Sequence, residues 1–270
     1  MTKIHDLEGY SYPTPEGVSP VVGDLPWHFG TENLNIVYKT DPEVVARYLP
    51  DPLEPGNNPD RVIVSFSKWW SLWDNQTDMP TINPERTWYT ETVIWVSSSY
   101  RGEQGKTCIH TWVDNDFTMA RGMFLGFPKK IGKTHKTDYN PMNPEMPSLS
   151  PGEELMGYTT AHGERLMEGR MEIEEEIPYE ELPAPTSKPL FNIRYFPSIE
   201  KEAEPSVCEL VKINGENARH GKVWSGKGDI KLYPSDIEEY SNLQPEDVIG
   251  AYYFENGVSI TGGEVLHSWV

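Results

Sequence analysis

The chain has 270 residues, which is long enough to bury a sizeable core in one large domain or two small ones. Its net charge is −19 and its pI is near 4.7. Because phosphate binding requires a basic face, this acidity argues against nucleic acid or an anionic membrane as a partner. The two cysteines, Cys108 and Cys208, are too few for a disulfide framework. Both lie in apolar segments that indicate buried free thiols.

The first 25 residues are rich in Pro, Gly and Tyr and show no periodicity, so we expect an irregular arm. The segment Met1–Leu7 lacks the apolar core of a signal peptide, and no stretch reaches membrane-spanning length. Together with reduced cysteines, this indicates a cytoplasmic protein. Residues 26–270 contain no repeat and no linker, which predicts a single domain.

After the arm, the pattern predicts a short strand at Leu34–Tyr38 and a short helix at Asp41–Leu49. Asp41 can cap this helix, Pro42 suits its first position, and Pro50 stops it.

From residue 61 onward, segments rich in β-branched and aromatic residues alternate with turns rich in Pro, Asn and Gly. Strands are expected at 61–67, 88–96, 107–113, 154–160, 166–174, 190–196, 207–213, 218–225 and 250–266. A second short helix is expected at 234–240, with Ser235 as its cap. Many antiparallel strands with few helices predict a mainly β chain folded as a closed or nearly closed antiparallel barrel.

The sequence Phe127-Pro-Lys-Lys130 ends an apolar stretch that begins at Met119. A lysine in apolar surroundings is costly to keep charged, and a second ammonium beside it acts in the same direction. A neutral lysine is a nucleophile that forms Schiff bases with carbonyl compounds. Alternatively, both lysines could cap a strand and point to solvent.

Several segments, in order, resemble the acetoacetate decarboxylase superfamily over about residues 28 to 268. They are Asn35–Asp41, Pro50–Glu54, Tyr89–Glu91, Gly126–Gly132, Val207–Val211 and Val223–Gly228. The resemblance implies a β-barrel with a closed apolar cavity, and it identifies Lys129 as the Schiff-base lysine and Lys130 as the neighbour that tunes it. It also identifies Glu91 with a glutamate of the family's active site, where it would transfer protons near the Schiff base.

Residues near this lysine are candidates for contact with substrate. Tyr89 and Glu91 lie two apart, so in a strand they face the same way, although Glu91 could also be a surface residue. Arg121 lies an even number of residues from Lys129 and could share its side or be exposed. Phe127 and Met123 flank the lysines. The expected loop 67–76 contains an aromatic cluster that could cover a pocket or belong to a core or subunit interface; its members are Trp69, Trp70 and Trp73.

Three positions depart from the decarboxylase pattern. Thr31 stands where the family has an arginine that holds the substrate carboxylate, the strand 61–67 lacks a glutamate, and Met123 replaces another glutamate. A retained lysine with fewer charged neighbours favours iminium chemistry over efficient acetoacetate decarboxylation. Some divergent members of the family are similar to aldolase-dehydratases that use pyruvate.

Other chemistries have weak support. The seven histidines lack metal-ligand spacing, no Cys-x₂-Cys is present, and no Gly-x-Ser-x-Gly elbow appears. We therefore expect no metal and no dissociable cofactor. The first expectation is a Schiff-base lyase that joins a small oxo acid to an aldehyde, and the second is a β-keto acid decarboxylase. A non-catalytic barrel that binds an apolar ligand is the alternative from another class. We also expect a homo-oligomer.

Overall fold

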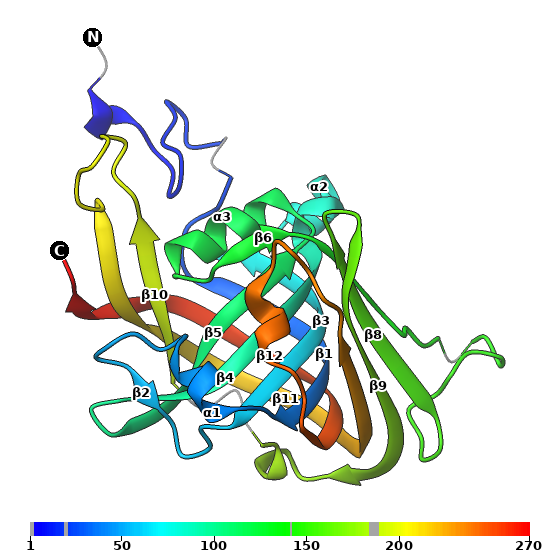
Figure 1. The fold of residues 1–270 in the computed structure, drawn as a ribbon. Coiled ribbons are helices and arrows are strands. Elements are labelled where there is room, and N and C mark those ends of the chain that lie inside the picture. The colour runs from blue at the N-terminus through cyan, green and yellow to red at the C-terminus, as the bar shows by residue number, and fades with distance from the viewer. Residues whose placement is uncertain (1–2, 19–20, 141, 184–188) are drawn as a thin grey trace.

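The computed structural model describes residues 3–18, 21–140, 142–183 and 189–270. A twelve-stranded sheet dominates it (Figure 1). The strands are β1 Trp27–Lys39, β2 Glu54–Pro55, β3 Arg61–Trp73, β4 Trp88–Tyr100, β5 Glu103–Val113, β6 Lys129–Ile131, β7 Lys133–Lys136, β8 Glu154–Ala161, β9 Glu164–Ile177, β10 Leu190–Phe196, β11 Val207–Leu232 and β12 Asp247–Ser268. The helices are α1 Pro42–Ala46, α2 Met79–Ile82 and α3 Asp116–Phe124, with short 3₁₀ turns η1 Ile4–Asp6, η2 Asp74–Gln76, η3 Pro84–Thr87, η4 Tyr179–Glu181 and η5 Glu239–Asn242. The expectation of a mainly β chain with a few short helices is confirmed.

The strand order is β10-β5-β4-β3-β1-β12-β11-β9-β8-β7. Strand β10 pairs with β5 at one edge and with β11 at the other, so this part of the sheet returns to its starting strand. Helix α3 lies across the upper end of these strands in Figure 1, and α1 lies toward the lower end. Within the described residues, no helix has the length and apolar character needed to cross a bilayer.

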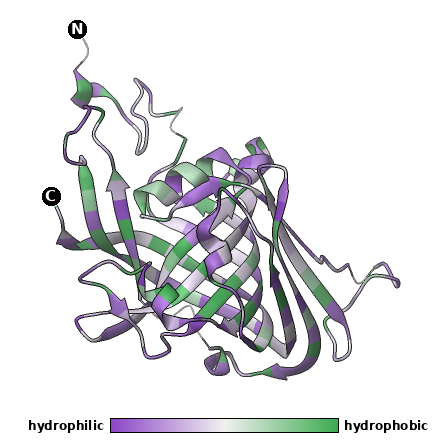
Figure 2. Ribbon diagram, viewed as in Figure 1, coloured by the Kyte–Doolittle hydropathy of each residue, from purple (hydrophilic) through white to green (hydrophobic). Residues whose placement is uncertain are grey.

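Alternation along the strands separates a packed core from a cavity, because successive side chains of a strand point to opposite faces. On β4, Ile94 and Val96 are buried in the main hydrophobic core, whereas Glu91, Val93 and Trp95 face a cavity. Figure 2 shows the same alternation as stripes of hydrophilic and hydrophobic residues along the strands. The spacing of two therefore decides which residues of β4 face the cavity.

Several strands are longer than the pattern predicts. The strand expected at Leu34–Tyr38 is the C-terminal part of β1, and Trp69, Trp70 and Trp73 belong to β3 and not to a loop. The strands expected at 207–213 and 218–225 form one strand, β11, because bulges at Asn214/Gly215 and Glu216/Arg219 absorb the residues between them.

The two expected helices have different outcomes. The first is confirmed but shorter: Asp41 Oδ1 accepts a hydrogen bond from Glu43 N at 2.8 Å, and α1 ends at Ala46. The second is wrong. Ser235 Oγ accepts a hydrogen bond from Ile237 N at 3.4 Å within a turn, and only the 3₁₀ turn η5 follows. A capping residue before a short, acidic segment is as compatible with a turn as with a helix.

The apolar stretch before the two lysines is helical, so the even spacing of Arg121 and Lys129 does not place them on one face of a strand. Asn115 accepts a hydrogen bond from Phe117 N at 3.2 Å and caps α3. Met, Ala and Arg then favour the helix. Gly126 reverses the chain with φ +77°, and a Cβ there would lie 2.8 Å from the backbone of Ile193 on β10. This turn leads into β6, which begins at Lys129.

The arm at residues 1–25 is partly ordered against the sheet. Val22 is buried in a cluster with Trp27 and Trp73. Its backbone N–H donates to Ser11 Oγ at 2.9 Å, and the ring of Tyr10 contacts that of Trp27 at 5.5 Å. The expected free thiols are present. Cys108 is buried as expected, whereas Cys208 is only half-buried.

Candidate active site

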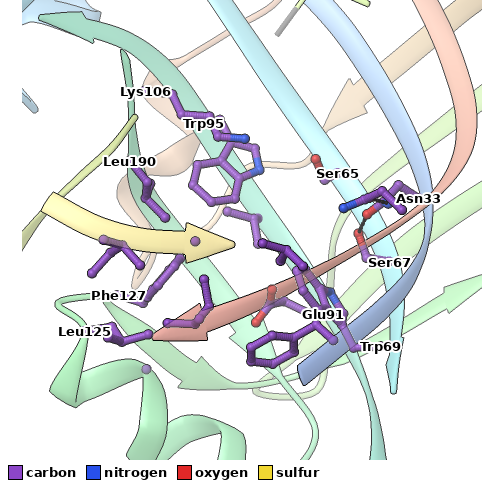
Figure 3. A pocket seen from close by; sticks show the side chains of 18 of the residues that line it. Asn33, Ser65, Ser67, Trp69, Glu91, Trp95, Lys106, Leu125, Phe127 and Leu190 are labelled. Carbon is purple, nitrogen blue, oxygen red and sulfur yellow. Dashed lines mark hydrogen bonds between the residues drawn. The ribbon is translucent and has the colours of Figure 1, made fainter. Parts of the chain in front are cut away.

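A cavity of about 510 Å³ opens between β1, β3, β4, β11 and β12, beneath α3, with β5 and β10 also contributing to its lining (Figure 3). The lining combines aromatic residues, among them Tyr89, Trp95 and Phe127, with polar residues such as Asn33 and Ser67. Six charged residues line the cavity, and they come from five elements; they are Glu91 on β4, Lys106 on β5, Arg121 on α3, Lys129 on β6, and Lys212 and Glu216 on β11.

Lys129 lies at the end of the cavity nearest α3. Its Nζ donates to Glu91 Oε2 at 2.6 Å and to Thr118 Oγ1 at 2.9 Å. The two charged side chains are only 6% and 4% exposed. Strand β6 pairs in parallel with β5 and aligns Lys129 with Thr111, which fixes where the lysine enters the cavity. The structure therefore brings together the amine and the carboxylate expected from the sequence.

Burial lowers the pKa of Lys129 below its ordinary value of 10.5. The negative charge of Glu91 opposes this shift, and the nearby guanidinium of Arg121 adds to it. The desolvated site disfavours the ammonium, because a charge loses its hydration there. A lysine with a lowered pKa has a neutral amine available at a lower pH than a surface lysine, as nucleophilic attack on a carbonyl requires.

Gly122 on α3 leaves room for the side chain of Lys129. A Cβ at this position would collide with the Cδ, Cε and Cγ atoms of Lys129. The side chain of Lys129 therefore crosses the helix where no side chain obstructs it. This is the physical reason for a glycine within the Met119–Phe124 part of α3, where it weakens the helix by about 1 kcal/mol relative to alanine.

Arg121 reaches the cavity from α3 and is 3% exposed. Its Nη1 donates to Ser71 Oγ at 3.2 Å, and its guanidinium carbon lies 4.6 Å from the centroid of the Phe29 ring and 5.6 Å from that of Tyr89. Its Nη2 is buried and has no hydrogen-bond partner among the described residues. A buried guanidinium with a free donor can bind a carboxylate.

The strand-parity prediction for β4 is confirmed. Tyr89 and Glu91 are both buried and both line the cavity. Thr90 and Thr92 face the other way, where they bond to Asp114 and to other threonines. Burial raises the pKa of Tyr89, and the charge of Glu91 adds to that rise, so this phenol stays protonated.

Neutral polar groups occupy the wall where decarboxylases were expected to have charges. Thr31 Oγ1 donates to Asn256 Oδ1 at 2.7 Å, Asn33 Nδ2 donates to Thr31 Oγ1 at 2.6 Å, and Ser67 Oγ donates to Asn33 Oδ1 at 2.8 Å. The buried Oδ1 of Asn35, which also lines the cavity, has no partner among the described residues. The residues that β3 contributes to the lining include no carboxylate; they are Ile63, Ser65, Ser67 and Trp69.

Two expected site residues lie outside the cavity. Met123 on α3 is 47% exposed and does not line the cavity that the structure brings Lys129 and Glu91 into. Lys130 points to the opposite face of β6 from Lys129, where it bonds to Glu238 and lies 5.3 Å from the Trp112 ring centroid. Adjacent strand residues point to opposite faces, and the ammonium of Lys130 is neutralised there.

We expect Lys130→Met to leave the pH profile of Schiff-base formation nearly unchanged. Burial dominates the lowered pKa of Lys129, and Lys130 is not among the charges that shift it. The measurement is the rate of borohydride trapping with pyruvate as a function of pH. Lys130→Arg, which keeps the charge, is the matched control. A profile displaced upward in Lys130→Met alone would show that the charge of Lys130 tunes Lys129.

Some cavity residues were missed from the sequence. Trp95 lies four residues after Glu91, and Asn33 and Asn35 lie two apart, so strand parity gives a signal for them. Lys106 gave no signal, because a lysine near the start of a strand is usually at the surface. Among the described residues, no group of three His, Cys, Asp or Glu side chains is placed to hold a metal.

The acetoacetate decarboxylase family model matches residues 11–269. Acetoacetate decarboxylase 1 of Bradyrhizobium diazoefficiens is 23% identical over 276 residues, which cover 99% of this chain and 97% of that protein. The enduracididine biosynthesis enzyme MppR, complexed with the condensation product of pyruvate and imidazole 4-carboxaldehyde, is 27% identical with a TM-score of 0.89 over 98% of both chains. Acetoacetate decarboxylase from Legionella pneumophila shares the fold, with 22% identity and a TM-score of 0.75 over 99% of both chains.

These likenesses extend over nearly the whole chain. They include the strand that carries Glu91 and the turn that delivers Lys129 to the cavity. The segments that suggested the resemblance therefore belong to one continuous match, and the chain is an enzyme of the acetoacetate decarboxylase family, a family of lyases.

Proposed function

We propose that this enzyme condenses pyruvate, or a closely similar small oxo acid, with an aldehyde and then removes water. The observation that carries the proposal is the buried pair of Lys129 and Glu91 close to Arg121, whose Nη2 has no hydrogen-bond partner among the described residues. An amine, a proton-transfer group and an anion-binding group are the minimum that this chemistry needs. No step requires a metal or a dissociable cofactor.

The reaction begins when the neutral amine of Lys129 attacks the ketone carbon of pyruvate and forms a carbinolamine. Loss of water gives an iminium, which acts as an electron sink. A proton then leaves the methyl carbon and gives an enamine, and Glu91, 2.6 Å from Lys129 Nζ, is placed to move protons in these steps. The enamine attacks the aldehyde carbon, and the aldehyde oxygen takes up a proton to become a hydroxyl. The former methyl carbon then loses a second proton, and the hydroxyl leaves as water, which gives a conjugated iminium. Hydrolysis of the iminium releases a conjugated oxo acid and restores Lys129.

Arg121 replaces the missing arginine of the decarboxylase pattern in this proposal. Thr31, at the position of that arginine, is engaged with Asn33 and Asn256 and carries no charge. The free Nη2 of Arg121 is buried in the same cavity as Lys129. A carboxylate that accepts a hydrogen bond from this guanidinium holds pyruvate with its ketone next to the amine.

Two comparisons support the pyruvate reaction. MppR is described in complexes with pyruvate and with a condensation product of pyruvate and an aldehyde. Its TM-score with this chain, 0.89, exceeds the 0.75 of the Legionella decarboxylase.

We also take the circuit of strands from β10 to β11 as the barrel that the sequence suggested, with residues 26–270 as its domain. A homo-oligomer in the cytoplasm remains a prediction.

Decarboxylation of a β-keto acid is the second candidate, because relatives such as the Bradyrhizobium protein are named acetoacetate decarboxylases. The same iminium would accept the electron pair left by departing CO₂, and the enamine would then take up a proton. The absence of a carboxylate from the β3 part of the lining argues against efficiency in this reaction.

The test compares the two reactions directly. Pyruvate with an aromatic aldehyde should give a conjugated product that absorbs in the ultraviolet, whereas CO₂ release from acetoacetate should be very slow. Each missing electrostatic contact at developing charge commonly costs about 10²–10³ in rate. Rapid CO₂ release, without product from any aldehyde, would replace the first candidate by the second.

A further inference from the structure

The cavity continues well beyond the space that pyruvate needs. Its volume of about 510 Å³ is typical of clefts that bind drug-sized ligands. On β5, Thr111 pairs with Lys129, and Lys106 lies five positions earlier, which corresponds to roughly 16 Å of strand. Figure 3 shows Lys106 and Trp95 at one end of the cavity and Glu91 toward the other. The acceptor aldehyde has to occupy the space between these two ends.

Among the residues that the structure describes, Lys106 has no counter-ion. Its Nζ lies 4.5 Å from the centroid of the Trp95 ring, and no carboxylate of the described residues forms an ion pair with it. Lys212, which lines the same cavity, is already neutralised by Glu103 at 2.6 Å. Burial lowers the pKa of Lys106 to about 8, so the side chain stays mostly protonated at pH 7. Lys106 is half-buried, and an ammonium partly removed from water is stabilised when an anion supplies the missing hydrogen bonds and charge.

Aromatic rings occupy the route from Lys129 to Lys106. Trp95 and Phe127 pack edge to face, with centroids 6.1 Å apart and planes at 81°. Both line the cavity, and Phe127 lies two residues before Lys129. Their faces offer an apolar surface for a flat group. This region therefore suits the body of a ligand better than its charged end.

We propose that the acceptor aldehyde carries an anionic group, such as a carboxylate, at the end remote from its carbonyl, and that Lys106 binds this group. The inference rests on the proposed function and names the class of its second substrate. Arg121 next to Lys129 holds the carboxylate of pyruvate, and Lys106 at the far end holds the anion of the aldehyde. Two separated cations orient the two substrates, so that the aldehyde carbon faces the enamine.

The kinetic test compares 4-carboxybenzaldehyde with 4-methylbenzaldehyde, each with saturating pyruvate. The ratio of their kcat/KM values should favour the carboxylated aldehyde in the wild type and fall about tenfold or more in Lys106→Met, because a charge-assisted hydrogen bond is lost. Lys106→Arg should restore most of the ratio. Lys212→Met, the matched control at the same end, should keep it. An unchanged ratio in Lys106→Met, with a normal circular dichroism spectrum, overturns the inference.

A binding measurement separates this inference from the proposed function. The corresponding alcohols, 4-carboxybenzyl alcohol and 4-methylbenzyl alcohol, cannot condense, and isothermal titration calorimetry measures their binding. Lys106→Met should weaken only the carboxylated alcohol. If that pattern holds but no aldehyde reacts and pyruvate does not label Lys129, the proposed function fails and the anion site stands. If Lys129 is labelled and product forms without any dependence on Lys106, the anion site is refuted.

Discussion

Reduction with borohydride in the presence of pyruvate should attach the reduced adduct to Lys129, and Lys129→Ala should abolish the label completely. The amine is buried in the cavity, and Glu91 lies 2.6 Å from it. Because burial lowers the pKa of Lys129 below 10.5, the neutral amine accumulates as pH rises and does so earlier than in a surface lysine. The trapping rate should therefore increase with pH and level off below 10.5. Peptide mass spectrometry locates the label, and the rate gives the pH profile.

Lys129→Arg is the matched control for this experiment. Removal of the lysine by alanine leaves Glu91 buried without its partner, which is destabilising in its own right. Arginine retains a cation against Glu91 but cannot form an imine. Absence of the label in both variants, with the arginine variant folded, assigns the loss to the missing amine. A label on Lys130 or Lys106, or no label with any oxo acid, would sink the assignment of Lys129.

Glu91→Gln should slow turnover by about 10²-fold or more and leave trapping at Lys129 largely intact. The amide keeps the shape of the side chain and an acceptor for the lysine, but it cannot exchange protons with the carbinolamine or the enamine. The negative charge of Glu91 raises the pKa of Lys129 against the effect of burial. Its removal should therefore lower that pKa further, and the trapping profile should reach its plateau at a lower pH than in the wild type.

The paired measurements distinguish proton transfer from a structural role. Turnover is followed by ultraviolet absorbance of the condensation product, and trapping is followed by mass on the same preparation. Normal turnover in Glu91→Gln would remove this residue from the mechanism. Loss of trapping together with turnover would instead place Glu91 in the formation of the Schiff base.

The sequence alone determined the β-rich architecture and one face of the site. The spacing of two in Tyr89–Glu91 follows from strand geometry, and the structure confirms that both residues face the cavity. The capped start of α1 was also readable, because Asp41 and Pro42 act on the backbone next to them. Local rules of this kind depend on neighbours in the chain, so the sequence carries them directly.

The same local rules failed where a segment fits both the two-residue period of a strand and the 3.6-residue period of a helix. The short apolar stretch from Met119 to Phe124 is compatible with a strand or a helix, and packing against the sheet decided for α3. Arg121 reaches the cavity through the geometry of α3 and the turn at Gly126, and not through strand parity with Lys129. The expectation about Arg121 was thus met by a different path of the chain.

Only the tertiary structure decided which charges meet. Glu238, which neutralises Lys130, lies more than 100 positions further along the chain. Because the two lysines point to opposite faces of β6, Lys129 pairs with Glu91 instead. The unpaired states of Arg121 and Lys106 are likewise properties of the folded cavity. Electrostatic interactions fall off with distance in space and strengthen on burial, and neither quantity is written in the order of residues.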